Sequence, residues 1–146
     1  MRTGFYLAPN VDEALENVEV SGNNSAEIFL HCLCAVFGLA LHQRFGYPIE
    51  YLVDSYGEDS SMDSLIHAYC FDPDSELYVD VRGATESEDE CFSEFEDFFT
   101  DGEVLGAPAE KMATWVKNQM GEETFQQYLI AAKGLIDQHP EYYSNF

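Results

Sequence analysis

The sequence has few basic residues. It carries 6 Lys and Arg against 28 Asp and Glu, which gives a formal net charge of -22. A surface of this charge repels nucleic-acid phosphates and anionic lipid headgroups. We therefore expect no direct binding to nucleic acid or to membranes. A basic protein surface is the partner that the charge favours.

The chain also lacks a disulfide framework and a long apolar run. The longest apolar stretch, residues 28–41, is broken by His31 and is shorter than the roughly 20 residues that a bilayer span needs. The first residues contain no apolar core of a secretion signal. No CxxC pair occurs among the four cysteines, which are Cys32, Cys34, Cys70 and Cys91. These absences predict a reducing, cytoplasmic setting.

What is present is typical of one folded domain. The chain has 146 residues, of which 46% are hydrophobic, and it includes 11 Phe and 9 Tyr. That length and composition suffice to bury a core and argue against global disorder. Because neither a repeat nor a low-complexity linker interrupts the sequence, we expect a single domain over residues 1–146.

The hydrophobic pattern predicts an α+β fold. Asn24 or Ser25 can cap a helix that is apolar on almost every side over residues 28–41 and ends at Gly46. A strand is expected over residues 49–53, followed by a hairpin of residues 65–71 and 76–81. Further helices are expected over residues 11–18, 87–99, 108–120 and 122–137, and a short strand over 103–105. The predicted fold is a buried central helix packed on a small antiparallel sheet and flanked by further helices.

The hairpin also predicts a pair of polar residues. With Asp72-Pro73-Asp74-Ser75 as the turn, paired positions sum to 147, and His67 lies directly opposite Asp80. The carboxylate could then fix the imidazole tautomer and leave the second ring nitrogen free as a base. A thiol from the central helix, Cys32 or Cys34, would complete a Cys-His-Asp set. An ordinary cross-strand ion pair is the alternative.

One face of the hairpin is wholly apolar: Ile66, Ala68, Cys70, Leu77, Val79 and Val81.

Three stretches of the chain resemble a known motif. They are residues 34–42 (CAVFGLALH) with the Gly46-Tyr47-Pro48 turn, residues 67–69 (HAY), and residues 78–83 (YVDVRG). The pattern is similar to that of small bacterial and phage proteins with a papain-like or transglutaminase-like core. The order Cys, His, Asp also resembles that of transglutaminases and arylamine acetyltransferases. The resemblance implies a thiol hydrolase or acyltransferase with Cys34 as nucleophile, His67 as base and Asp80 as the group that orients His67.

The predicted helix start leaves a second interpretation open. A helix that begins near Ser25 places Cys34 more than two turns inside it, whereas a reactive thiol is favoured at a helix N-terminus. Cys34 would then be a small buried hydrophobe in a scaffold without activity. The remaining cysteines, Cys32, Cys70 and Cys91, are expected to be core residues.

No metal or cofactor site is predicted. His31 and Cys34 form an i, i+3 pair, but two further ligands at suitable spacing are lacking. The acidic loop after the first strand matches no calcium-binding loop, although it contains Asp54, Glu58, Asp59 and Asp63. A solvated acidic loop is the simpler interpretation.

The acidic residues suggest a different class of function. Residues 86–103 contain no Lys or Arg, and the phenylalanines of the helix expected there leave the carboxylates to cover its other side. A row of carboxylates on a helix can imitate duplex phosphates. Such a role resembles DNA-mimic anti-restriction and anti-CRISPR proteins of phages, or acidic immunity proteins that neutralise toxins. It implies a non-catalytic inhibitor that binds a basic nucleic-acid-binding protein or toxin. The alternative is a solvated face that keeps the protein soluble. The predicted partner-binding residues are Glu88, Asp89, Glu96 and Asp97.

Overall fold

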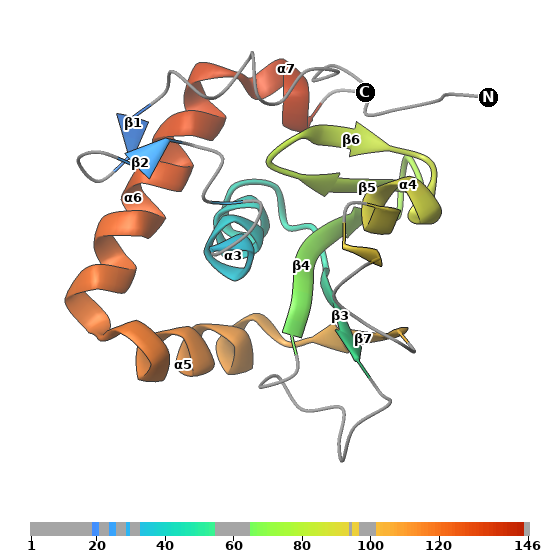
Figure 1. Ribbon diagram of the computed structural model, residues 1–146. Helices are drawn as coiled ribbons and strands as arrows, with labels where there is room; N and C mark the ends of the chain where they lie inside the picture. The colour runs from blue at the N-terminus through green and yellow to red at the C-terminus, as the bar shows by residue number, and fades with distance from the viewer. Residues whose placement is uncertain are drawn as a thin grey trace.

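The computed structural model describes residues 19–20, 24–25, 29, 33–54, 65–93, 95–96 and 102–144. Within these ranges the fold is α+β, as predicted, with a five-stranded antiparallel sheet of strand order β6-β5-β4-β3-β7 (Figure 1). The sheet strands are β3 (Ile49–Asp54), β4 (Leu65–Asp72), β5 (Leu77–Asp80), β6 (Gly83–Thr85) and β7 (Gly102–Ala107). The helices are α3 (Cys34–Phe45), α4 (Glu88–Ser93), α5 (Ala109–Met120), α6 (Glu122–Gln138) and α7 (Pro140–Tyr143).

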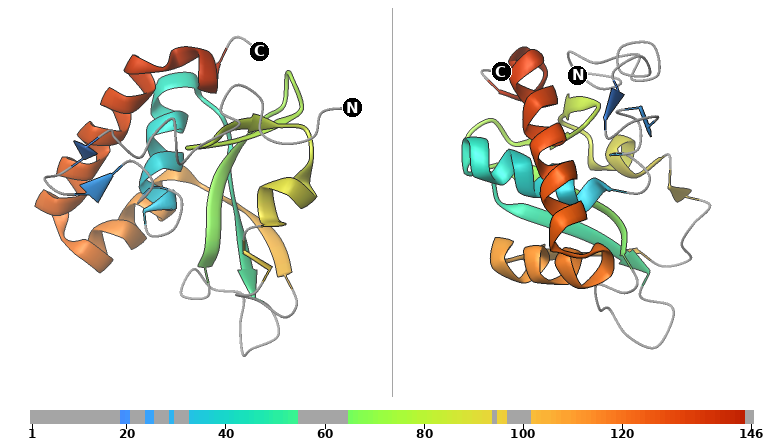
Figure 2. Two further views of the ribbon diagram at one scale, coloured as in Figure 1. Left: turned by 45° about the horizontal axis from the view of Figure 1, so that its top comes forward. Right: turned by 90° about the vertical axis from the view of Figure 1, so that its left-hand side faces the viewer.

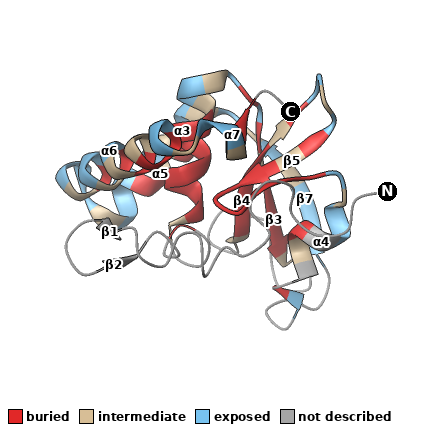
Figure 3. Ribbon diagram, turned by 90° about the horizontal axis from the view of Figure 1, so that it is seen from above, coloured by how far each residue is buried: buried red, intermediate tan, exposed pale blue. Residues whose placement is uncertain are grey.

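Helix α3 is the centre of the fold. Every residue from Cys34 to Leu41 is buried, because α3 lies between the sheet on one side and α5 and α6 on the other (Figure 3). The helix ends at Gly46, whose positive φ of 78° is the left-handed conformation that favours glycine at this position. The all-round apolar pattern therefore correctly predicted a buried central helix.

The predicted start of this helix is wrong. Asn24 and Ser25 form the short strand β2 (Asn24–Ser25), which pairs with β1 (Glu19–Val20). Helix α3 begins at Cys34 instead. Local capping chemistry favoured a helix at Asn24, but pairing with β1 decides the conformation there. The helix expected over residues 11–18 lies outside the described residues.

The hairpin of β4 and β5 is shifted by two residues from its predicted register. Cys70 pairs with Val79 and Asp72 with Leu77, so paired positions sum to 149 rather than 147. The turn is four residues long because Asp72 holds it closed: its carboxylate accepts hydrogen bonds from Asp74 N at 3.0 Å and Ser75 Oγ at 2.6 Å. An even shift leaves each side chain on its predicted face.

Both faces of the sheet are covered near β4. Cys70 Sγ donates a hydrogen bond to the Gly38 carbonyl at 3.3 Å, which places Cys70 against α3, in the core as predicted. On the opposite face the Tyr69 ring contacts the Phe92 ring of α4, with centroids 5.6 Å apart. Helices α3 and α4 thus lie on opposite sides of the sheet (Figure 2). Residues of both alternating sets are buried on β4 for this reason.

Two short elements, β6 and α7, were not predicted. Tyr143 of α7 is fully buried, and its hydroxyl donates to the Val81 carbonyl at 2.8 Å. Its own carbonyl accepts a 2.8 Å hydrogen bond from the Tyr47 hydroxyl. Through the Tyr143 hydroxyl, helix α7 is therefore hydrogen-bonded to the turn between β5 and β6. Within the described ranges, no helix combines the length and apolar character needed to cross a membrane.

Candidate active site

Cys34 is the first residue of α3, not a mid-helix residue. The first main-chain hydrogen bond of the helix runs from Phe37 N to the Leu33 carbonyl at 3.2 Å, so the N–H groups at its start have no partner within the helix. The thiol is 5% exposed, and Ala68 N of β4 donates a hydrogen bond to Cys34 Sγ at 3.3 Å. The sulfur of Cys34 therefore lies at a helix N-terminus and accepts a hydrogen bond from the main chain of β4.

A gap in the strand pairing makes the contact between Cys34 and β4 possible. The described ladder between β4 and β5 extends only from Cys70–Val79 to Asp72–Leu77. Ala68 therefore lies beyond the ladder, at the point where β5 ends. The helix start occupies this position, which brings the sulfur to the edge of β4 next to His67.

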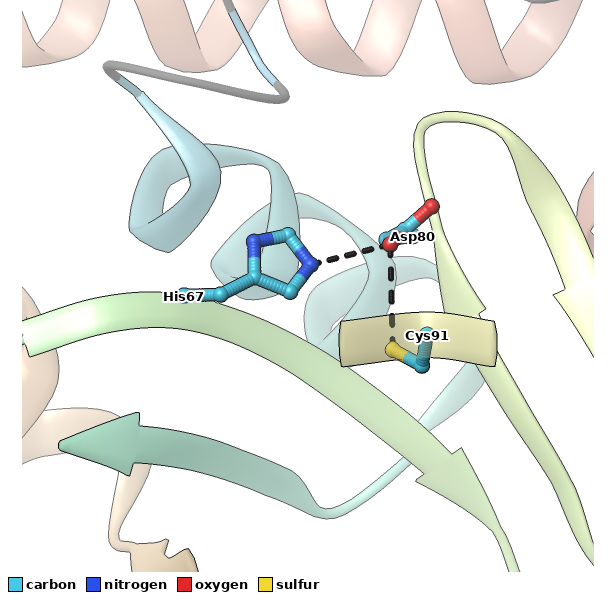
Figure 4. Close-up of side chains that lie close together, drawn as sticks. All are labelled: His67, Asp80 and Cys91. Atoms are coloured by element: carbon cyan, nitrogen blue, oxygen red, sulfur yellow. Dashed lines mark hydrogen bonds and ion pairs between the residues drawn. The ribbon is translucent and has the colours of Figure 1, made fainter. Parts of the chain in front are cut away.

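His67 and Asp80 form the predicted pair, although they are not direct cross-strand neighbours. His67 Nε2 lies 2.9 Å from Asp80 Oδ2, and the two side chains are 0% and 3% exposed (Figure 4). In the observed register they are diagonal neighbours, which long side chains can still bridge. The predicted contact is present, and the predicted register is wrong.

Arg82 completes the surroundings of Asp80. Its Nη2 lies 2.6 Å from Asp80 Oδ2, and its Nε and backbone N donate to Oδ1 at 3.2 and 2.9 Å. The guanidinium also donates to the Cys91 carbonyl at 2.9 Å. Sequence reasoning assigned no role to Arg82. The sequence feature that could have indicated a role for Arg82 is its position two residues after Asp80, in a chain with only 6 Lys and Arg. The turn between β5 and β6 folds the arginine back onto Asp80.

The charges of these three residues are coupled. Burial alone would raise the pKa of Asp80, but the Arg82 guanidinium and the hydrogen bond from His67 outweigh it and hold that pKa well below its usual range. Burial would lower the pKa of His67, but the bond to Asp80, with the nearby thiols of Cys34 and Cys91, raises that pKa well above 6.5. The imidazole is therefore protonated near neutral pH and shares the Asp80 carboxylate with Arg82.

The second imidazole nitrogen, Nδ1, is directed away from Asp80 (Figure 4). It is buried and has no hydrogen-bond partner among the described residues. The ring is held by stacking on Phe95, with centroids 4.4 Å apart. A buried polar atom without a partner typically costs roughly 1–3 kcal/mol, so its presence calls for a reason. Exchange of a proton with the Cys34 sulfur is a chemical role that would supply one, although the two atoms form no hydrogen bond in this structure.

Cys91 is a further member of this cluster. It is buried, as predicted, but its sulfur is 4.0 Å from Asp80 Oδ2 rather than among apolar side chains alone. Burial raises the pKa of the Cys91 thiol. Cys91 is thus a neutral hydrogen-bond donor to the carboxylate. Its position on an apolar helix stripe gave no sequence signal for this contact.

The residues around Asp80 do not fit a metal ion well. Ligand atoms of His67, Asp80 and Cys91 lie within 4.8 Å of one another. However, both oxygens of Asp80 already accept hydrogen bonds from Arg82, and the adjacent guanidinium repels a cation. The metal-ligand pair considered in the sequence, His31 with Cys34, includes a residue outside the described ranges.

A second group of predicted site residues lines a hollow on the surface. Glu88, Asp89 and Glu96 are exposed and border a cavity of about 260 Å³. Its remaining lining consists of Leu52, Phe92, Gly102 and Val104. The structure therefore brings three of the four predicted carboxylates together; Asp97 lies outside the described residues. Cys32, Glu58, Asp59 and Asp63 lie outside them as well.

Comparison with protein-family models, curated proteins and solved structures finds no match to this chain. The fold and the site alone describe the class of protein: an α+β domain with a buried cluster of cysteine, histidine and aspartate at the start of its central helix.

Proposed function

We propose that the protein is a thiol hydrolase or acyltransferase with a papain-like or transglutaminase-like arrangement of Cys34, His67 and Asp80. One observation carries the proposal: Cys34 lies at the N-terminus of α3 and accepts a hydrogen bond from Ala68 N, the residue after His67, whose imidazole is bound to Asp80. A nucleophile next to a base that a third group orients is the arrangement that covalent catalysis requires.

The electrostatics favour a reactive sulfur. A protonated imidazole beside a thiol favours the thiolate, which is the nucleophilic form. Asp80 holds the imidazole through Nε2, and Arg82 fixes the carboxylate in turn. This leaves Nδ1 as the nitrogen through which His67 gives and receives protons.

The reaction begins when the Cys34 thiolate attacks the carbonyl carbon of an amide or ester. A C–S bond forms, and the carbonyl oxygen becomes an oxyanion near the N–H groups at the start of α3 that have no partner within the helix. His67 donates its proton to the leaving amine or alcohol as the C–N or C–O bond breaks. Water, or an acceptor amine or alcohol, then attacks the thioester and gives a proton to His67, which releases the acyl product and restores the thiolate.

Acylation by an activated ester tests this function. The protein is incubated with 4-nitrophenyl acetate near neutral pH, and both nitrophenol release and the intact mass are followed. We expect an acetyl group on the wild-type chain and none on Cys34→Ser. His67→Gln should slow acylation by about 100-fold or more, because a positioned base contributes about 10²–10⁴-fold.

Cys70→Ser is the matched control for this experiment, because Cys70 is a buried thiol that donates a hydrogen bond to the Gly38 carbonyl, one turn along α3 from Cys34. It should acylate at the wild-type rate, and circular dichroism confirms that each variant is folded. Equal acylation of wild type and Cys34→Ser would refute the proposed function.

The acidic cavity favours a second candidate function, a non-catalytic inhibitor of a basic protein. Glu88, Asp89 and Glu96 line the cavity together with apolar side chains that include Leu52 and Phe92. A lysine or arginine side chain fits such a site, because its aliphatic stem can pack on the floor while its charged end meets the carboxylates. The partner would be a nucleic-acid-binding protein or toxin whose phosphate-binding surface the carboxylates occupy.

Charge reversal tests the second candidate. Binding of fluorescein-labelled oligolysine is measured by anisotropy in low and physiological salt. The triple variant Glu88→Lys/Asp89→Lys/Glu96→Lys should weaken binding by at least about ten-fold beyond the control described next, because the cavity adds packing to general attraction.

The control reverses three exposed acidic residues away from the cavity, Asp74, Glu110 and Glu123, and changes the net charge by the same amount. If both triple variants lose affinity equally, binding depends on net charge alone and the cavity is not a recognition site.

A further inference from the structure

A second cavity, of about 190 Å³, lies between the start of α3 and helix α5. One wall comes from the start of α3: Leu33, Ala35 and Val36 line it, and Leu33 and Ala35 are the residues on either side of Cys34. Leu65 of β4, two residues before His67, lines it as well. Cys34 itself does not line the cavity, which meets the chain on either side of it.

The opposite wall comes from the second half of α5. It consists of Trp115, Val116, Gln119 and Met120. Val116 is almost completely buried, whereas Gln119 is exposed. Among the described lining residues, the polar groups are the Gln119 amide and the indole N–H of Trp115. An apolar cavity of this kind excludes charged groups, because their loss of hydration would not be compensated.

The size of the cavity limits what it can hold. Apolar cavities of about 150 Å³ in proteins bind benzene. A volume of about 190 Å³ therefore accommodates a phenyl ring or a branched aliphatic group. We propose, on the basis of the cysteine chemistry above, that this cavity is the acyl-side specificity pocket, and that the substrate carries an aromatic or branched aliphatic group next to its reactive carbonyl.

Trp115 makes binding in the pocket measurable without any chemistry, because it is the only tryptophan of the chain. Phenylacetamide is titrated while the fluorescence of Trp115 is recorded. It should give a saturable change in wild type and in Cys34→Ala, whereas acetamide should not. Gln119→Phe, which fills the cavity from its exposed side, should abolish the change.

Asn118→Phe is the matched control, since Asn118 is exposed, neighbours Gln119 and does not line the cavity. It should leave the response to phenylacetamide intact. No saturable change in wild type, or an intact response in Gln119→Phe, would overturn the pocket assignment.

A second experiment compares the rates at which 4-nitrophenyl phenylacetate and 4-nitrophenyl acetate acylate the protein. Each rate is divided by the rate at which the same ester reacts with free cysteine. Wild type should prefer the phenylacetyl ester by at least about ten-fold, in the range that an apolar pocket provides. Gln119→Phe should lose this preference and still react with the acetate. Acylation of Cys34 without preference overturns the pocket, whereas no Cys34-dependent acylation by either ester overturns the proposed function.

Discussion

Replacement of Arg82 by Met should destabilise the protein more than any loss of a surface charge. Asp80 is 3% exposed and accepts three hydrogen bonds from Arg82, of which the methionine variant keeps only the one from the backbone N–H. The hydrogen bond from His67 also remains. The aspartate would then stay buried with one charged neighbour instead of two.

The magnitude follows from the burial of the pair. Removing one partner of a buried ion pair costs roughly 3–5 kcal/mol, because the other charge is left without compensation. Arg44 and Asp137 provide a matched exposed pair: their atoms are 2.7 Å apart, close to the 2.6 Å between Arg82 and Asp80, but their side chains are 42% and 58% exposed. Such a pair contributes about 0–1 kcal/mol. Arg82→Met should therefore lose at least about 2 kcal/mol more than Arg44→Met.

Urea unfolding of both variants measures this difference in the free energy of unfolding. The double variant Arg82→Met/Asp80→Asn should recover part of the lost free energy of unfolding. It removes the Asp80 charge, which the single variant leaves buried without the guanidinium. A loss for Arg82→Met no larger than that for Arg44→Met would show that the cluster is not held together as described.

Two further results are expected. The pKa of His67 is raised in the folded state, so its stabilisation is fully present below the ordinary value of 6.5 and is lost as pH rises through the raised pKa. His67→Gln should accordingly lose more unfolding free energy at about pH 6 than at about pH 10; an equal loss at both would contradict the raised pKa. Tyr143→Phe leaves the Val81 carbonyl without its donor and should cost about 1–3 kcal/mol in the same assay, with a loss near zero counting against the role of α7.

The sequence was most informative where a pattern repeats along the chain. The apolar character of residues 34–41 on every side correctly indicated a helix surrounded by other elements. Alternation along β4 placed His67 on the same face as Asp80 whether the register was right or wrong by two residues. The hairpin register itself could not be predicted, because it depends on how Asp72 closes the turn.

The rest of the site depends on contacts that a sequence pattern does not encode. The start of α3 at Cys34, which decides between a reactive and an inert thiol, was hidden by a capping signal at Asn24 that strand pairing overrides. Arg82 and Cys91 reach Asp80 only because β5 turns into β6 and α4 folds over the sheet. These contacts depend on how a turn and a helix fold back onto Asp80, which the helix and strand propensities of the residues do not reveal.

Alkylation of Cys34 by iodoacetamide is the most direct measurement of whether His67 activates this sulfur. The experiment uses a Cys32→Ser background and locates the label by peptide mapping near neutral pH. Cys34, which is buried but 5% exposed, should react faster in the folded protein than after unfolding in urea. The thiols of Cys70 and Cys91, which are 0% exposed and whose pKa values are raised by burial, should stay protected. His67→Gln should remove the acceleration. Protection of Cys34 equal to that of Cys70, or an unchanged rate in His67→Gln, would contradict an activated thiol.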